Sequence, residues 1–203
     1  MTKIKTVYFD WGGVVATDPG DEFLDQILTD IGASRAQIDE IYHSSMRQFM
    51  SGEISEQQYW QALRDRYNFV IEETISQRFF ELGGLNANKD IMKLISEVKE
   101  KGFKVGLLTN VIEPSYNALK QMGRYEVFDS VTASCIVGSN KPDKTIYDIA
   151  LKSLDTEASE ALFIDDKERN LAPARIMGMT TILAKNPEQI IEDTYKALPQ
   201  LNG

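Results

Sequence analysis

The feature that most constrains the fold is an alternation that begins after residue 88, between apolar residues at helical spacing and short uninterrupted apolar runs. Apolar residues recur at helical spacing over 91–98, and a short uninterrupted apolar run follows at 105–108, as expected of a buried strand. The alternation continues with expected strands around Val131 and at 161–164 and 180–183, and an expected helix at 146–154. Strands separated by helices pair in parallel, so the sequence predicts an α/β fold with helices on both faces of a parallel sheet.

One further short strand, 7–9, comes near the amino terminus and leads into Asp10, Trp11 and two glycines. Ligands of open parallel sheets bind at the carboxyl ends of strands, which makes Asp10 a candidate reactive group. Taken alone, this motif is explained equally well as an Asp-Gly turn. A role for Asp10 therefore depends on the other strand ends.

The region between this strand and the alternating helices and strands after residue 88 is predicted to be helical. Apolar residues recur at helical spacing from 23 to 49, after the turn at 18–20. Ser34 with Gln37, and Ser55 with Gln58, have the spacing of a capping box, which marks two helix starts. We expect a small helical cap over 18–84, inserted in a core made of 1–17 and 85–203.

Composition limits the classes of partner and the compartment. The formal net charge of −9 disfavours nucleic acid or an anionic membrane surface as a partner, because both would repel the protein. The one cysteine, Cys135, cannot form an internal disulfide, and no apolar run has the length of a signal peptide or a membrane span. We expect a cytoplasmic protein, and the sequence does not indicate its oligomeric state.

Polar side chains follow three of the later strands. Thr109 and Asn110 can hold phosphate oxygens, Lys141 can neutralise an anion, and the adjacent Asp165 and Asp166 can bind a cation. In isolation, Thr109 and Asn110 are explained more simply as helix caps, and Lys141 as a solvated surface residue. The paired carboxylates after an apolar strand are hard to explain as structure alone, and they favour a functional site.

These four stretches resemble, in order and spacing, the four motifs of the haloacid dehalogenase superfamily. Residues 163–178 are similar to its phosphatase-like branch, which includes glucose-1-phosphate phosphatases and the amino-terminal domain of soluble epoxide hydrolases. The resemblance extends from residue 7 to residue 183. It implies a Rossmann-like core with a helical cap after the first strand, in agreement with the division made above.

The resemblance also implies a nucleophile and a metal site. Asp10 would attack phosphorus and form an aspartyl-phosphate, which divides hydrolysis into two easier displacements. Asp10, Asp166 and the backbone carbonyl of Gly12 would bind Mg²⁺, a hard cation that prefers such oxygen ligands.

The remaining motif residues would support this centre. Thr109 and Asn110 would hold the transferring group, and Lys141 would offset negative charge during catalysis. Asn170 would orient the water shell of the metal, or Asp166, from behind the direct ligands. Asp165 matches a position outside the usual ligands and is expected to be a neighbour of the site.

Gly12 is the main departure from the superfamily pattern. Most phosphatases of the superfamily carry an aspartate there, which protonates the leaving oxygen and then activates water; such catalysis is typically worth roughly a hundred- to ten-thousand-fold. Glycine keeps the carbonyl but has no group for proton transfer. The glucose-1-phosphate phosphatase branch also has glycine at this position. Candidate substitutes are Asp18, Asp21 and Glu113, each of which is also explained as a turn or helix-start carboxylate.

The predicted function is Mg²⁺-dependent hydrolysis of a small phosphorylated metabolite, with a sugar phosphate as one candidate. One alternative is a 2-haloacid dehalogenase, which also uses an aspartate nucleophile and lacks the second acid. Dehalogenases carry serine and asparagine before the final acid of the fourth motif, whereas Asp165 and Asp166 here predict a cation site. The other alternative is a weakly active or inactive member that binds a phosphorylated ligand. Arg47 of the cap is a candidate to contact a sugar or carboxylate of the substrate.

Overall fold

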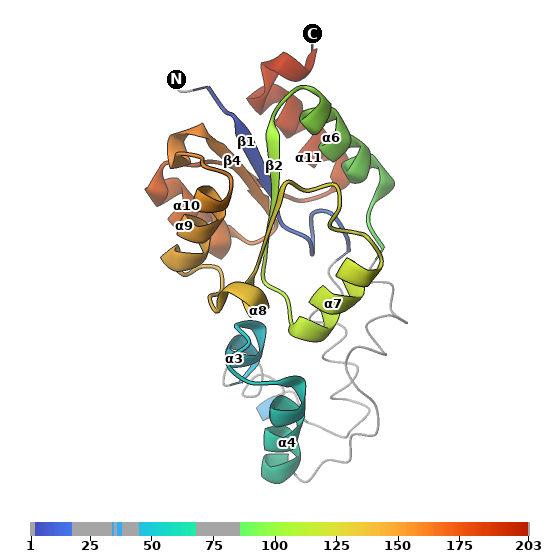
Figure 1. Ribbon diagram of the computed structural model, residues 1–203, viewed down its shortest axis with the longest axis vertical. Coiled ribbons are helices and arrows are strands. Elements are labelled where there is room, and N and C mark those ends of the chain that lie inside the picture. Colours follow the sequence, from blue (N-terminus) through green and yellow to red (C-terminus); the bar gives the residue numbers. More distant parts are fainter. Residues whose placement is uncertain (1–2, 18–33, 35, 38–44, 68–85, 203) are drawn as a thin grey trace.

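A five-stranded parallel sheet forms the centre of the computed structural model, which describes residues 3–17, 34, 36–37, 45–67 and 86–202 (Figure 1). The strand order is β3-β2-β1-β4-β5. The strands are β1 (Thr6–Phe9), β2 (Lys104–Thr109), β3 (Ser130–Ala133), β4 (Ala161–Asp165) and β5 (Thr180–Leu183). The α/β fold class and its parallel sheet are confirmed.

Helices come between the successive strands of the sheet, and one further helix follows the last strand, β5. They are α6 (Lys89–Glu100), α7 (Glu113–Gln121), α8 (Ser134–Val137), α9 (Lys144–Ser153), α10 (Glu168–Met177) and α11 (Pro187–Ala197), with short 3-10 helices at Ala158–Glu160 and Pro199–Asn202. Among the residues described, no helix combines the length and apolar character needed to cross a membrane.

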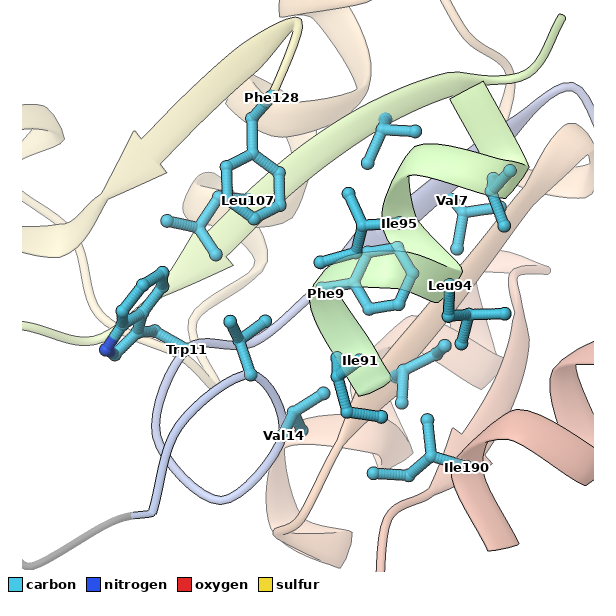
Figure 2. Close-up of a cluster of buried hydrophobic side chains, with 14 of the residues drawn as sticks. Val7, Phe9, Trp11, Val14, Ile91, Leu94, Ile95, Leu107, Phe128 and Ile190 are labelled. Carbon is cyan, nitrogen blue, oxygen red and sulfur yellow. The ribbon is translucent and has the colours of Figure 1, made fainter. Parts of the chain in front are cut away.

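Two separate cores lie on the two faces of the sheet, because successive side chains of a strand point to opposite sides. Val7 and Phe9 of β1 belong to the cluster that includes Ile91 of α6, as Figure 2 shows. Tyr8, between them, belongs to the other cluster with α9 and α10, and its hydroxyl donates a hydrogen bond to the carbonyl of Ala150 at 2.8 Å. The helices therefore cover both faces, as predicted.

Two helices, α3 (Met46–Met50) and α4 (Glu56–Tyr67), come between β1 and α6 in the sequence and lie beyond the sheet, with α3 next to α8 (Figure 1). The predicted capping box at the start of α4 is confirmed: the Gln58 N–H donates to Ser55 Oγ at 3.2 Å, and the Ser55 N–H donates to Gln58 Oε1 at 2.8 Å. Much of 18–84 lies outside the described residues, so the boundaries of the cap stay a prediction.

Candidate active site

The register of the sheet brings the predicted site residues to one edge. Phe9 of β1 pairs with Leu107 of β2 and with Ile164 of β4. The residues that follow these three positions therefore share the carboxyl edge of the sheet. Asp10 directly follows β1, and its N–H donates to the carbonyl of Ile164 at 2.9 Å. Because the strands are parallel, distant parts of the sequence meet here.

Three carboxylates gather at this edge. Asp10, Asp165 and Asp166 each offer an oxygen, and these oxygens all lie within 4.8 Å of one another. Asp10 and Asp165 are buried, whereas Asp166 is partly exposed. Carboxylate oxygens are the ligands that hard divalent cations such as Mg²⁺ prefer, so the donor set fits such an ion.

The loop after β1 brings its backbone close to Asp166. Gly13 has φ +75°, and its N–H donates to the carbonyl of Ala16 at 2.8 Å, which closes a tight turn. A Cβ on Gly13 would lie 2.5 Å from Asp166 Cγ, so a residue with a side chain cannot stand here without displacing that carboxylate. Gly12, whose carbonyl is a predicted metal ligand, lies in the same turn and is partly exposed.

Lys141 lies at the centre of the cluster with its side chain closed off from solvent. Its ammonium is 2.8 Å from Asp10 Oδ2 and 2.6 Å from Asp165 Oδ2, and it donates to the carbonyl of Leu108 at 3.0 Å. Three acceptors account for all three N–H groups of the ammonium. Burial lowers the pKa of Lys141, but the attraction of the two carboxylates outweighs burial and holds that pKa above its usual value. The alternative explanation of Lys141 as a solvated surface residue is therefore excluded.

The two carboxylates beside Lys141 differ in their other partners. Burial alone would raise the pKa of Asp165, but Lys141, the Lys167 N–H at 2.8 Å and Asn170 together hold this pKa below its usual value. Burial raises the pKa of Asp10, against the attraction of Lys141 and a hydrogen bond from Thr109. Asp165 is thus stabilised in its charged form as the counterion of Lys141, whereas the charged form of Asp10 is less stabilised.

Thr109 and Asn110 end β2 at the same edge. Thr109 is buried, and its hydroxyl reaches Asp10. Asn110 holds the backbone of Lys141 at both polar groups: its Nδ2 donates to the Lys141 carbonyl at 2.9 Å, and its Oδ1 accepts from the Lys141 N–H at 2.8 Å. The side chain of Asn110 therefore fixes the position of Lys141, an arrangement that the sequence did not reveal. The peptide bond between Lys141 and Pro142 is cis.

Asn170, on α10, lies behind the carboxylates. Its Nδ2 donates to both oxygens of Asp165, at 3.0 and 3.1 Å, and its backbone carbonyl accepts from the Tyr147 hydroxyl at 2.6 Å. Its Oδ1 is buried and has no hydrogen-bond partner within the part of the chain that the structure describes. Asn170 is thus held in place by these hydrogen bonds, and its Oδ1 can accept a further one.

Of the three candidate proton-transfer groups, Glu113 lies among the described residues. Glu113 is the first residue of α7 and is exposed, and Asp18 and Asp21 lie outside the described residues. The structure also brings in Gly13, which sequence reasoning did not single out as a site residue. The signal that could have found it is the pair of glycines directly after Asp10 and Trp11.

Comparison with known proteins identifies the family of this fold and site. The sequence profile of the haloacid dehalogenase-like (HAD-like) hydrolases matches residues 4–178. The sesquiterpene phosphatase astK of Aspergillus oryzae is 30% identical over 181 residues, which are 88% of either protein. Bifunctional epoxide hydrolase 2 of Rattus norvegicus is 32% identical over 145 residues, which are 66% of this chain and 23% of that longer protein.

Solved structures agree with this match. A HAD-like family hydrolase of Porphyromonas gingivalis superposes with a TM-score of 0.80 and 25% identity, over 97% of this chain and 98% of that one. A HAD family enzyme of Bacteroides thetaiotaomicron, in complex with magnesium and inorganic phosphate, superposes with a TM-score of 0.72 over 90% of this chain and 94% of that one, at 17% identity. The resemblance and the expectation of an enzyme are confirmed, and the chain belongs to the haloacid dehalogenase-like hydrolase family.

Proposed function

We propose that this protein is a Mg²⁺-dependent phosphomonoester hydrolase that acts through an aspartyl-phosphate on Asp10. The observation that carries the proposal is the meeting of Asp10, Asp165 and Asp166 within 4.8 Å, beside one buried ammonium. Lys141 contacts Asp10 and Asp165, so its single charge cannot neutralise all three carboxylates. Such an excess of negative charge is tolerated when a divalent cation joins the group.

Asp10, Asp166 and the carbonyl of Gly12 would hold this ion. When bound, Mg²⁺ would supply positive charge to the phosphoryl oxygens and orient them for attack. Asn170 Oδ1, buried and without a partner among the described residues, would accept a hydrogen bond from a water of the ion's shell. The B. thetaiotaomicron enzyme, crystallised with magnesium and inorganic phosphate, supports this choice of ion.

The chemistry begins at the Asp10 carboxylate. One oxygen accepts the Trp11 N–H at 2.7 Å and the other contacts Lys141, so the group is fixed in orientation before substrate arrives. An Asp10 oxygen would form a bond to phosphorus while the bond from phosphorus to the leaving oxygen breaks. Water would then attack phosphorus, which restores the carboxylate and releases inorganic phosphate.

Other residues of the edge would hold the transferring group and balance its charge. Thr109 and Asn110 would contact phosphoryl oxygens, since the Asn110 Nδ2 keeps one N–H beyond its bond to Lys141. Lys141 would act through Asp10, because its three N–H groups already have acceptors. Asp165 would keep Lys141 charged and in place.

Proton transfer to the leaving oxygen is the step with no assigned residue. Gly12 has no side chain to perform it, and Glu113 is the one candidate substitute that lies among the described residues. We expect a substrate whose leaving group needs little protonation, or slow turnover with leaving groups that need more.

A small phosphorylated metabolite, such as a sugar phosphate, is the proposed substrate. The relatives support a phosphorylated substrate but differ in its organic part, since one is named a sesquiterpene phosphatase and another a ribulose-1,5-bisphosphate 5-phosphatase. The cytoplasmic location and the absence of nucleic-acid and membrane partners stay predictions.

The test is a screen of phosphorylated metabolites for released phosphate by malachite green, with and without Mg²⁺, beside chloride release from 2-haloacids. Phosphate release that needs Mg²⁺ supports the proposal. Chloride release without metal would make the protein a dehalogenase. Specific binding of a phosphorylated ligand without release of either ion would make it a binding protein.

A further inference from the structure

Lys141 lies within a four-residue turn, Asn140 to Asp143, whose first and last residues are joined by a hydrogen bond. The Asp143 N–H donates to the Asn140 carbonyl at 2.8 Å. Asn110 holds the turn from the side of the sheet, through the backbone of Lys141. The position of this turn therefore determines where the Lys141 ammonium lies relative to Asp10.

One residue of the segment between β1 and α6 contacts both ends of this turn. Arg47, on α3, accepts a hydrogen bond at its carbonyl from Asn140 Nδ2 at 2.9 Å. Its guanidinium pairs with the carboxylate of Asp143. Asn140 is only 4% exposed, so its side-chain contact with Arg47 is closed off from competing water.

The Asp143 side chain pairs with Arg47 and does not cap the helix that follows it. Asp143 is the residue before α9, with extended backbone, where an aspartate often accepts hydrogen bonds from the first turn of the helix. It makes no such capping bond and pairs with Arg47 instead. The ion pair with Arg47 therefore takes the place of a capping hydrogen bond at the start of α9.

Helix α3 itself is anchored on the core at two further points. Ser134 Oγ donates to the carbonyl of Met50 at 2.7 Å. Gly52, with φ +73°, passes so close to α8 that a Cβ would lie 2.7 Å from the Cys135 carbonyl oxygen. Arg47 is thus presented to the turn from a fixed support, which is what a residue needs in order to hold another in place.

From these contacts we infer that Arg47 is a positioning residue for Lys141: it connects the inserted helices to the ammonium that lies beside the nucleophile. This inference rests on the proposed function of Asp10 and Lys141. It replaces the expectation that Arg47 contacts the substrate, and the two roles differ in kinetics. Loss of a positioning contact lowers kcat, whereas loss of a substrate contact raises KM.

The experiment compares Arg47→Gln, Arg47→Lys and the wild-type protein, with p-nitrophenyl phosphate and Mg²⁺. Arg47→Gln should lower kcat by about two- to fivefold, with KM changed less than about twofold, which is the size expected from one exposed ion pair that orients a catalytic group. Arg47→Lys keeps the charge and should retain most of the activity. Arg175→Gln is the matched control, since it breaks a similarly exposed ion pair, with Glu168, and should leave both constants unchanged.

A second measurement reads the position of Lys141 without turnover. In protein labelled with ¹⁵N-lysine, the buried Lys141 ammonium should give a separate NMR signal, identified by its loss in Lys141→Met. Arg47→Gln should shift this signal, and Arg175→Gln should not. An unshifted signal, or a rise in KM at constant kcat, overturns the inference. If the signal shifts but no phosphomonoester is hydrolysed in an Asp10-dependent way, the proposed function fails while the contact between Arg47 and the turn stands.

Discussion

Lys141 Nζ lies 2.6 Å from Asp165 Oδ2, and neither side chain is exposed to solvent. Breaking a buried ion pair from one side leaves the other charge without compensation, at a typical cost of about 3–5 kcal/mol. Lys141→Met should therefore lower the free energy of unfolding by about this amount, as measured by urea denaturation, and should also abolish activity.

The double variant Lys141→Met with Asp165→Asn provides the control. It removes one of the two carboxylates that lose their counterion in Lys141→Met, the other being Asp10, so it should recover part of the lost stability without any activity. A double variant no more stable than Lys141→Met alone would contradict the assignment of Asp165 as the counterion of Lys141.

We expect Asp166 to bind Mg²⁺, and Asp165 to stabilise the folded protein through its contact with Lys141. Saturating Mg²⁺ should raise the melting temperature of the wild-type protein, because an ion at a hundred times its Kd contributes about 2.7 kcal/mol. Asp166→Asn should lose most of this rise. Asp165→Asn should be destabilised even without metal, since it weakens the contact with Lys141. Equal Mg²⁺ responses in Asp166→Asn and wild type would remove Asp166 from the ion site.

Gly13 and Gly138 form a matched pair for testing the loop after Asp10. Their φ angles are +75° and +71°, so an alanine at either position costs backbone strain of about 1 kcal/mol. Only at Gly13 does the added Cβ meet Asp166; at Gly138 nothing lies within 4 Å. Gly13→Ala should lower kcat/KM by at least about tenfold and Gly138→Ala by less than about twofold, and Gly13→Ala should lose the more stability of the two because its Cβ displaces Asp166. Equal activities would show that the close approach to Asp166 is unimportant.

Asp129 should make stability depend on pH in the acid range. Its Oδ2 accepts the Val105 N–H at 2.8 Å and its Oδ1 pairs with Lys99 at 2.8 Å. Burial alone would raise the pKa of Asp129, but these partners outweigh it and hold that pKa below its ordinary value of 3.8. The stabilisation is therefore complete above about pH 4 and disappears as the pH falls through the lowered folded-state pKa.

The variant Asp129→Asn should be about 1 kcal/mol less stable than wild type at pH 7. This difference should shrink as the pH falls through the lowered folded-state pKa of Asp129, and denaturation over a series of acid pH values measures it. A difference independent of pH would assign the effect to shape instead of charge.

Much of the core was predictable because its signals are local. The apolar runs of 105–108 and 161–164 lie within β2 and β4, and the helical spacing of 91–98 lies within α6. Helix α10 was not predicted, since Pro173 lies inside it and its apolar face is weak. Helix α11 was also missed, although Asn186 caps it and Pro187 begins it, which are helix-start signals in the sequence.

The site was predictable in its residues but not in its contacts. Strand ends of a parallel sheet meet at one edge, so Asp10, Lys141 and Asp166 could be placed together without coordinates. That Asp165 neutralises Lys141, or that Asn110 holds the Lys141 backbone, depends on side-chain directions that no spacing encodes.

The most direct test of the central claim is phosphate release by Asp10→Asn, measured with Mg²⁺ on the best substrate of the screen. Asparagine keeps the shape of the side chain but cannot form the acyl-phosphate, so release should fall by at least about a thousandfold while the protein remains folded. Activity comparable to wild type in this variant would contradict the account.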